Sequence, residues 1–469
     1  MNSSPDLLVV GGLVVNDDWS APATVVVRDG RIAQVIAAGE PIPPISDGTR
    51  VVDATGHLVL PGGVDPHTHI GMSLGDYTTR DGYLEATTAA LWGGTTTVVD
   101  FAIPTAGQSP LEAVLERREA AALGVCDAAL HACVVDWDDS VPGQLREMAE
   151  LGVRTVKLFT TYRDVVMADP GTVVRVMESL RTLGGMAYVH AEANHLVESD
   201  QDKAVSAGRI DASGHAHTRS ELAEVTAVRE VLSSAAALDV PVYFVHQSTP
   251  EAISEVRRAR ARGVRAYTET CPHYLTLDDS AYQSESPELY VCCPPLRSAS
   301  TVAGVVRRAL AREVDTIGSD HCCYSLEQKR ADRSDVRVMP NGMPGVETRM
   351  PVIFTELVRR RRLPLERFVA LTAANPARLN GIHPQKGVIA PGSDADLLII
   401  DPTETRTVTA AELHMATDYS PYEGKSLSGW PSTVIVRGEV LLHQGALHVA
   451  GHHGKALESE PLVQDRLIC

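Results

Sequence analysis

The sequence of 469 residues has no long apolar run and no excess of positive charge. No stretch approaches the roughly 18 apolar residues of a transmembrane helix, and Met1 to Asp6 lacks the basic start and apolar core of a secretory signal. The 42 lysines and arginines are outnumbered by 60 aspartates and glutamates, for a formal charge of -18. Binding to a phosphate backbone needs clustered basic residues. We therefore expect a cytoplasmic protein that binds neither a membrane nor a nucleic acid.

The sequence also lacks a cysteine spacing typical of disulfide frameworks. It contains eight cysteines, and in a reducing compartment a thiol usually behaves as a small buried apolar group. Adjacent residues of a strand point to opposite faces, so Cys292-Cys293 and Cys322-Cys323 cannot chelate one ion as a C-x-x-C motif does. Buried free thiols are the favoured interpretation, and a thiol nucleophile at Cys322 or Cys323 beside His321 is the alternative.

What the sequence does contain, at both of its ends, is short runs of strand-forming residues. LLVVGGLVV and TVVVRDGRIAQVI lie near the N-terminus, and DADLLIIDP and STVIVRGEVLLHQG lie near the C-terminus. Each run has β-branched residues bounded by turn formers. We predict that residues 1–57 and 386–455 pair into one small β-sandwich domain, and that residues 456–469 form a C-terminal tail.

Between these ends, residues 58–385 alternate strand-like apolar runs with helical patterns, which indicates βα units around a parallel sheet. There are eight runs, the number in a (β/α)₈ TIM-type barrel: HLVLPGGVDPHTH, TTTVVDFAIP, AALHACVVDW, RTVKLFTTY, MAYVHAEAN, VYFVHQST, RAYTETCPHYL and VDTIGSDH. Active sites of such barrels lie at the C-terminal ends of the strands. Polar residues that close a run are therefore the first candidates for the site.

Histidine and aspartate close four of these runs. The first run ends with His67 and His69, which are two residues apart, so both imidazoles face the same side of a strand and can reach one cation. His190, His246 and Asp320 close the fifth, sixth and eighth runs. Imidazole and carboxylate are ligands of zinc, manganese or iron. The sequence therefore predicts a metal site at the C-terminal end of the barrel.

A second His-x-His, His215-Ala216-His217, lies in a polar stretch with no apolar run before it. It lacks the strand that would direct both imidazoles to one side. We expect these residues to form a loop without a metal.

Lys157 lies inside TVKLF, at the end of the fourth run, where an ammonium would be desolvated and would repel nearby cations. Burial lowers the pKa of a lysine, and the neutral amine can add carbon dioxide to give a carbamate with two oxygens that could bridge two metals. The alternative is a lysine whose ammonium reaches solvent. The candidate ligands around Lys157 favour the carboxylated form.

Ten stretches together resemble one family: LPGGVDPHTH, GGTTTVVDF, VKLF followed by Tyr162, YVHAE, VHQST, CPHYL, CPPLR, GSDHC, PNGMPGVE and KGVIAPGSDADL. They look like the dihydropyrimidinase and D-hydantoinase branch of the amidohydrolase superfamily, over nearly the whole chain. The resemblance implies two divalent ions, zinc with manganese as the alternative, and carbon dioxide for N6-carboxylation of Lys157. It implies one ion held by His67, His69, Lys157 and Asp320, and the other by Lys157, His190 and His246.

The resemblance also implies residues that handle the substrate. Tyr162 would donate to the oxyanion and Asn341 would hydrogen-bond the ring. The backbone at Cys293, where a serine is usual in the family, would contact the ring as well, and Phe159 would help to shape the pocket around the ring substituent. His273 stands where glutamine is common, and we assign it no ligand role.

The implied activity is hydrolysis of a cyclic amide, a dihydropyrimidine or a 5-substituted hydantoin, to an N-carbamoyl amino acid. A metal-bridging hydroxide would attack the carbonyl, and Asp320 would carry its proton to the ring nitrogen. An allantoinase-like or dihydroorotase-like enzyme and a non-catalytic interaction protein are the alternatives. Ile70-Gly71-Met72 follows the first His-x-His where dihydroorotase-like chains tend to have an arginine, so a neutral ring fits better. The resemblance further implies a homotetramer or homodimer.

Overall fold

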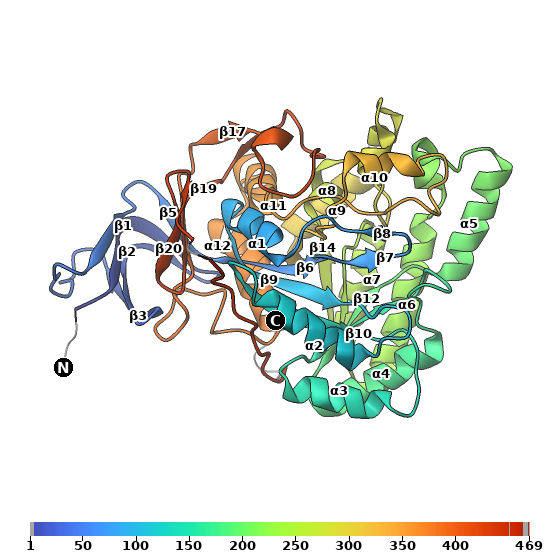
Figure 1. Ribbon diagram of the computed structural model, residues 1–469, viewed down its shortest axis with the longest axis horizontal. Helices are drawn as coiled ribbons and strands as arrows, with labels where there is room; N and C mark the ends of the chain where they lie inside the picture. The colour runs from blue at the N-terminus through green and yellow to red at the C-terminus, as the bar shows by residue number, and fades with distance from the viewer. Residues whose placement is uncertain (1–3, 450, 463–467, 469) are drawn as a thin grey trace.

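The computed structural model describes residues 4–449, 451–462 and 468, and in it two large sheets lie toward opposite ends of an elongated molecule (Figure 1). One is an eight-stranded parallel sheet with strands in sequence order. Its strands are β6 (Gly63–Thr68), β9 (Thr95–Ala102), β10 (Asp127–Cys133), β11 (Thr155–Phe159), β12 (Met186–His190), β13 (Val242–Phe244), β14 (Ala266–Thr270) and β15 (Thr316–Ile317). Each of the eight predicted runs supplies one of these strands.

The sheet curls into a barrel that closes between β6 and the residues after β15. The backbone N–H of His69 donates to the carbonyl of His321 over 2.9 Å, and the N–H of Asp320 donates to the carbonyl of His67 over 3.0 Å. The predicted (β/α)₈ barrel is therefore confirmed. Its closure brings the ends of the first and eighth runs side by side.

Helices cover the outside of the barrel (Figure 1). Two of them, α2 (Pro110–Ala121) and α7 (Pro250–Arg260), begin with proline after a Ser or Thr cap, Ser109 and Thr249. The others are α1 (Tyr83–Trp92), α3 (Val141–Glu150), α4 (Pro170–Leu183), α5 (Asn194–Ser206), α6 (Glu221–Leu238), α8 (Pro272–Thr276), α9 (Ala299–Leu310), α10 (Leu326–Ala331), α11 (Arg349–Ile353), α12 (Leu365–Val369) and α13 (Asn375–Leu379).

The other large sheet joins both ends of the chain, as the sequence predicts. Its order is β21-β20-β19-β16-β5-β1-β2-β3, and β4 pairs with β1. The bounds are β1 (Leu7–Val15), β2 (Ser20–Arg28), β3 (Arg31–Ala37), β4 (Arg50–Asp53), β5 (Leu58–Pro61), β16 (Leu397–Ile400), β19 (Pro431–Val436), β20 (Glu439–His443) and β21 (Ala446–Leu447). Two small two-stranded sheets lie outside the large ones, β7 (Ser73–Leu74) with β8 (Tyr77–Thr78) and β17 (Thr405–Thr407) with β18 (Ser426–Ser428).

The first predicted run differs from expectation because it forms two strands. Its start, β5, belongs to the terminal sheet, where it pairs with β1 and β16, and its end, β6, belongs to the barrel. The chain passes from one sheet to the other at Gly62, where an added Cβ would lie 2.0 Å from Oγ1 of Thr96. Only glycine allows this close approach. The domain bounds of 58–385 for the barrel and of 1–57 with 386–455 for the terminal domain stay a prediction.

A buried ion cluster links the barrel to the terminal sheet. The Nζ atom of Lys386, with 1% of its side chain exposed, lies 2.6 Å from Asp127, at the start of β10. It also lies 2.8 Å from Asp396 and 3.1 Å from Asp394, both just before β16. These carboxylates raise the pKa of Lys386 although its burial acts in the opposite direction. The charged Lys386 therefore holds two regions of the fold together.

The described part of the C-terminal tail packs against the barrel. Backbone N–H groups of Leu457 and Ser459 donate to the carbonyls of Ala128 and Gly152, and the N–H of Leu462 donates to the carbonyl of Gly184. These carbonyls lie near the N-terminal ends of β10, β11 and β12. The tail thus contacts the end of the barrel opposite to the one where the candidate residues were predicted.

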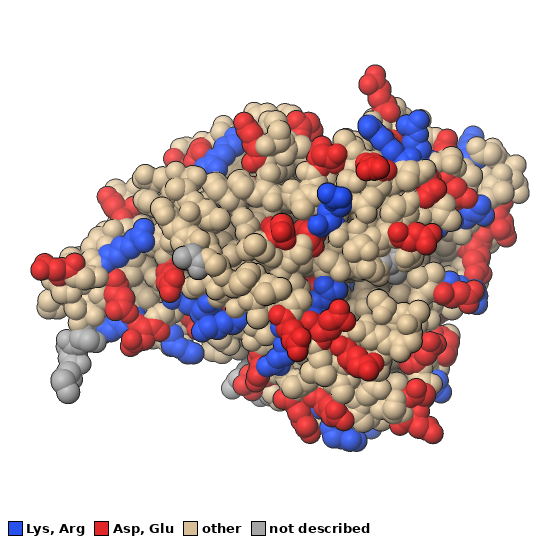
Figure 2. Space-filling view, in the orientation of Figure 1, with Lys and Arg blue, Asp and Glu red and all other residues tan. Residues whose placement is uncertain are grey.

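The surface in Figure 2 shows acidic and basic side chains interspersed, without a continuous basic patch among the described residues that face the viewer. Nothing on this face resembles a track for a phosphate backbone. Among residues 4–449, 451–462 and 468, no helix combines the length and the apolar character needed to span a bilayer.

Candidate metal centre

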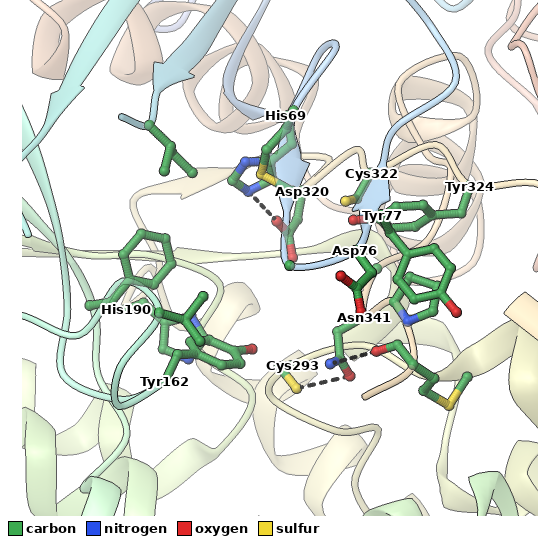
Figure 3. A pocket seen from close by; sticks show the side chains of 18 of the residues that line it. His69, Asp76, Tyr77, Tyr162, His190, Cys293, Asp320, Cys322, Tyr324 and Asn341 are labelled. Atoms are coloured by element: carbon green, nitrogen blue, oxygen red, sulfur yellow. Dashed lines mark hydrogen bonds and ion pairs between the residues drawn. The ribbon is translucent and has the colours of Figure 1, made fainter. Parts of the chain in front are cut away.

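A cavity of about 270 Å³ opens at the C-terminal ends of the barrel strands (Figure 3). Its wall combines side chains from the ends of β11 and β12, from the loops after β6, β13 and β15, and from residues 337–342. The wall includes nine of the ten residues that the sequence singles out, namely His69, Lys157, Phe159, Tyr162, His190, His246, Cys293, Asp320 and Asn341. The tenth, His67, lies fully buried directly behind His69.

His67, His69 and Asp320 converge on one point. The Nε2 atoms of His67 and His69 lie 3.1 Å and 3.3 Å from Oδ1 of Asp320 and 3.2 Å from each other. Nδ1 of His67 lies 2.7 Å from Oε1 of Glu269 at the end of β14, which fixes the ring and leaves its Nε2 lone pair directed at the cluster. These three atoms have the chemistry and the spacing to hold a divalent cation.

Two more imidazoles lie beside this cluster. The ring of His246 lies 5.3 Å from the ring of His67 and 4.5 Å from the ring of His190, measured between centroids. His190 donates from Nε2 to Oε2 of Glu192 over 2.7 Å, so its Nδ1 lone pair is free to bind an ion. Burial is the main cause that holds the pKa of His246 well below its usual range, and the positive charges of His190 and Lys157 lower it further. The neutral imidazole is the form that binds metals.

Lys157 lies fully buried between the two groups of histidines. Its Nζ lies 4.5 Å and 4.8 Å from the ring centroids of Phe101 and Phe159 and has no hydrogen-bond partner. Burial lowers its pKa to about 8. The Nδ1 atoms of His69 and His246 are also buried without a partner, whereas buried polar groups are normally satisfied. A cluster of unsatisfied donors and acceptors of this kind fits residues that hold metal ions.

Three residues of the site have left-handed backbone conformations that are uncommon outside glycine. The φ angle is 68° at Tyr162, 39° at His246 and 52° at Asp320. Such conformations cost free energy and persist where the surrounding structure enforces them, often at functional sites. Here they turn the side chains that follow β11, β13 and β15 toward the cavity.

The residues expected to handle a substrate line the same cavity. In Figure 3, Tyr162 lies beside His190, and the centroids of their rings are 5.5 Å apart. The thiol of Cys293 donates to Oδ1 of Asn341 over 3.2 Å on the next part of the wall. Tyr162, Cys293 and Asn341, together with Phe159, therefore surround a space large enough for a small ring.

The second His-x-His motif is not part of the cavity wall. His215-Ala216-His217 forms part of a short 3₁₀ helix, η1 (Ala212–His217), rather than a loop, because Asp211 caps it. His215 donates from Nε2 to the carbonyl of Cys292. Nε2 of His321 lies 2.5 Å from Asp81, and its Nδ1 accepts from the backbone N–H of Gly345, so neither nitrogen is free to activate a thiol.

Three residues that support the site were not predicted from the sequence. Glu192 follows His190 by two residues and supports it, and its position in YVHAE could have indicated this role. Glu269 reaches His67 from a strand 202 residues away. Arg219 lies 2.7 Å from Glu192 and 4.6 Å from the ring centroid of Tyr162, although no motif marked it. Burial alone would raise the pKa of Glu192, but the charge of Arg219 and the hydrogen bond from His190 hold it at about 2.

The chain is similar to known proteins over most of its length. The sequence profile of the amidohydrolase family matches residues 58–441. A D-hydantoinase from Streptomyces coelicolor is 37% identical over 92% of this chain and 93% of its own length. A dihydropyrimidinase from Rattus norvegicus is 36% identical over 98% of this chain and 89% of its own.

A solved structure gives the same result for the fold. The dihydropyrimidinase from Brevibacillus agri superimposes with a TM-score of 0.93 at 33% identity and covers 97% of this chain and 99% of that one. Family profile, sequence identity and three-dimensional likeness thus agree over almost the full length. The chain belongs to the amidohydrolase family, a family of metal-dependent enzymes, within its branch of D-hydantoinases and dihydropyrimidinases.

Proposed function

We propose that the protein hydrolyses a cyclic amide, a dihydropyrimidine or a 5-substituted hydantoin, to an N-carbamoyl amino acid with the help of two divalent metal ions. The observation that carries the proposal is the buried, unpaired Lys157 between His67, His69 and Asp320 on one side and His190 and His246 on the other. Relatives named D-hydantoinase and dihydropyrimidinase are similar over nearly the whole chain, which supports the same choice.

The residues that would hold the ions form two sets that share Lys157. One set is His67, His69, Lys157 and Asp320, and the other is Lys157, His190 and His246. For Lys157 to belong to both, its neutral amine must add to carbon dioxide, which forms an N–C bond and releases one proton. The lowered pKa, about 8, keeps part of the amine neutral near physiological pH.

Bound divalent ions supply a hydroxide nucleophile at neutral pH and polarise the substrate carbonyl. Zinc is our first choice because four imidazoles with carboxylate-type oxygens suit it well, and manganese is the second. Every ligand residue that the family resemblance implies is present in the sequence.

The remaining steps belong to side chains of the cavity wall. Tyr162 donates its hydroxyl hydrogen to the oxyanion that forms on the attacked carbonyl. Asp320 accepts the proton lost by the nucleophile and returns it to the ring nitrogen as the C–N bond breaks. Asn341 and the backbone at Cys293 hold the ring, and Phe159 contacts its substituent. A cavity of about 270 Å³ suits a substrate of this size.

The test combines metal content with ring opening of dihydrouracil and 5-phenylhydantoin, for the wild type and for Lys157→Ala. We expect two ions per chain in the wild type and loss of both metal and activity in the variant. Allantoin and dihydroorotate, assayed in parallel, decide between this function and its nearest alternatives. A wild type without metal and without activity on any of the four rings would instead support a non-catalytic protein.

We also propose that the protein acts in the cytoplasm as a homotetramer or homodimer. The localisation is supported by the free, buried thiols of the described cysteines, and the assembly is supported by the family to which the chain belongs. Sedimentation equilibrium of the metal-loaded protein tests the assembly, and a monomer at micromolar concentration would contradict it.

A further inference from the structure

Behind the cavity wall lies a buried cation that the proposed function does not use. Arg219 follows η1 and precedes α6, and 5% of it is exposed. Its Nη1 lies 2.7 Å from Oε2 of Glu192, which is fully buried. Its guanidinium carbon lies 4.6 Å from the ring centroid of Tyr162, within the range of a cation–π contact. One planar group therefore contacts two different parts of the site.

Glu192 links Arg219 to His190, which is a proposed metal ligand. The same oxygen of Glu192 that receives Arg219 also accepts from Nε2 of His190 over 2.7 Å. A carboxylate in this position fixes the orientation of a metal-binding imidazole. Arg219 in turn fixes the carboxylate, because a bidentate-capable guanidinium holds its partner more rigidly than an ammonium does.

The other contact of Arg219 is with Tyr162, which lies on a loop and has an uncommon backbone conformation. Tyr162 has a φ angle of 68°, and its ring meets the rings of Phe159 and His190 edge to face, at 6.2 Å and 5.5 Å between centroids. Edge contacts of this kind limit rotation less than a group stacked on the face of the ring. The guanidinium of Arg219 supplies that stacked group.

We propose that Arg219 is a positioning residue that fixes the position of the Tyr162 hydroxyl relative to His190. Its guanidinium stacks on the ring of Tyr162 and forms an ion pair with Glu192, which in turn orients His190. This inference rests on the proposed function, in which Tyr162 stabilises the oxyanion. Arg219 is not among the residues that line the cavity. Its effect is on the geometry of the transition state, where displacements of about 1 Å can cost on the order of 100-fold in rate.

Arg219→Lys separates the two contacts. A lysine can keep the ion pair with Glu192 but has no planar group to stack on Tyr162 at the same time. We expect Arg219→Lys to retain two metal ions and a KM within about twofold of the wild type, and to lose about tenfold in kcat. In a Tyr162→Phe background the same substitution should change kcat by less than about twofold, because the hydroxyl that Arg219 positions is already absent.

A buried arginine remote from Tyr162 provides the matched control. Arg349 is fully buried and donates to the carbonyls of Val64 and Ile317. Arg349→Lys should have the same effect on kcat in both backgrounds. If Arg219→Lys is also additive with Tyr162→Phe, or leaves kcat unchanged, the proposal is wrong.

A second readout does not depend on turnover. With ¹³C-labelled tyrosine, the signal of Tyr162 among the 12 tyrosines is the one lost in Tyr162→Phe. That signal should shift and broaden in Arg219→Lys and stay unchanged in Arg349→Lys. If the Tyr162 signal does not move in Arg219→Lys, the stacking contact is wrong. If the signal moves but the wild type hydrolyses none of the ring substrates, the proposed function is wrong and the positioning role of Arg219 is retained.

Discussion

Replacing Lys157 by methionine should remove function and yet stabilise the metal-free protein. In carbon-dioxide-free buffer the lysine is unmodified, and its Nζ is buried with no hydrogen-bond partner. Burial lowers its pKa from 10.5 to about 8. Each pKa unit corresponds to about 1.4 kcal/mol, so folding with a charged Lys157 costs roughly 3 kcal/mol at pH 7. Methionine has a similar length and carries no charge, and the variant should gain up to that amount.

The gain should depend on pH in a defined direction. Well below pH 8 the lysine is protonated in both the folded and the unfolded chain, and the folded chain bears the full cost. Between pH 8 and 10.5 the folded chain releases the proton before the unfolded chain does. The stability of the wild type therefore rises with pH over this interval relative to the variant. The advantage of methionine should shrink from pH 8 and level off near pH 10.5.

Urea unfolding of the chelator-treated protein at pH 7 and pH 10 measures both effects. Lys386→Met is the matched control, because Lys386 is equally buried but has three carboxylate partners within 3.1 Å. Removing it leaves those carboxylates without their shared cation, which should cost about 3–5 kcal/mol. If Lys157→Met destabilises the protein as Lys386→Met does, Lys157 is a structural ion-pair partner and not an unpaired amine, and the reasoning fails.

Three further outcomes are expected. His69→Ala should lower the metal content per chain, whereas His217→Ala should leave it unchanged, and equal losses would mean that the second His-x-His also binds metal. Gly62→Ala should destabilise by about 1–3 kcal/mol because its Cβ would overlap Thr96. Gly48→Ala, with no atom within 4 Å, is its control, and equal urea midpoints would refute the close approach. Cys323→Ala should keep kcat within about twofold, since burial raises the pKa of this thiol and His321 is already engaged. A loss of turnover with intact metal content would reopen the thiol mechanism.

The sequence predicted the barrel and the proposed ligands because both depend on local pattern. Strand-like runs alternate with helical ones, and the candidate ligands stand at the run ends, where the barrel rule puts an active site. The supporting residues were not predictable in this way. Glu269 meets His67 across the barrel, and Arg219 reaches Glu192 and Tyr162 from a connecting segment. Such partners depend on tertiary packing between segments that are remote in sequence.

The division of the first run at Gly62 shows a similar limit. Periodicity identifies apolar strand residues but not the sheet that receives them, and β5 and β6 read as one run because both are buried. The cue was the glycine itself, whose role became clear only from its contact with Thr96.

The seam of the barrel has a consequence for how metal and fold depend on each other. β15 has two residues, and the barrel closes beside it through backbone hydrogen bonds of His67, His69 and Asp320, the residues that converge on one proposed ion. A ligand that binds only the closed form adds its own binding free energy to closure. When the ion is scarce, the barrel should therefore open first between its first and eighth strands. The concentration of the metal ion would then set the lifetime of the folded state as well as the rate of the reaction.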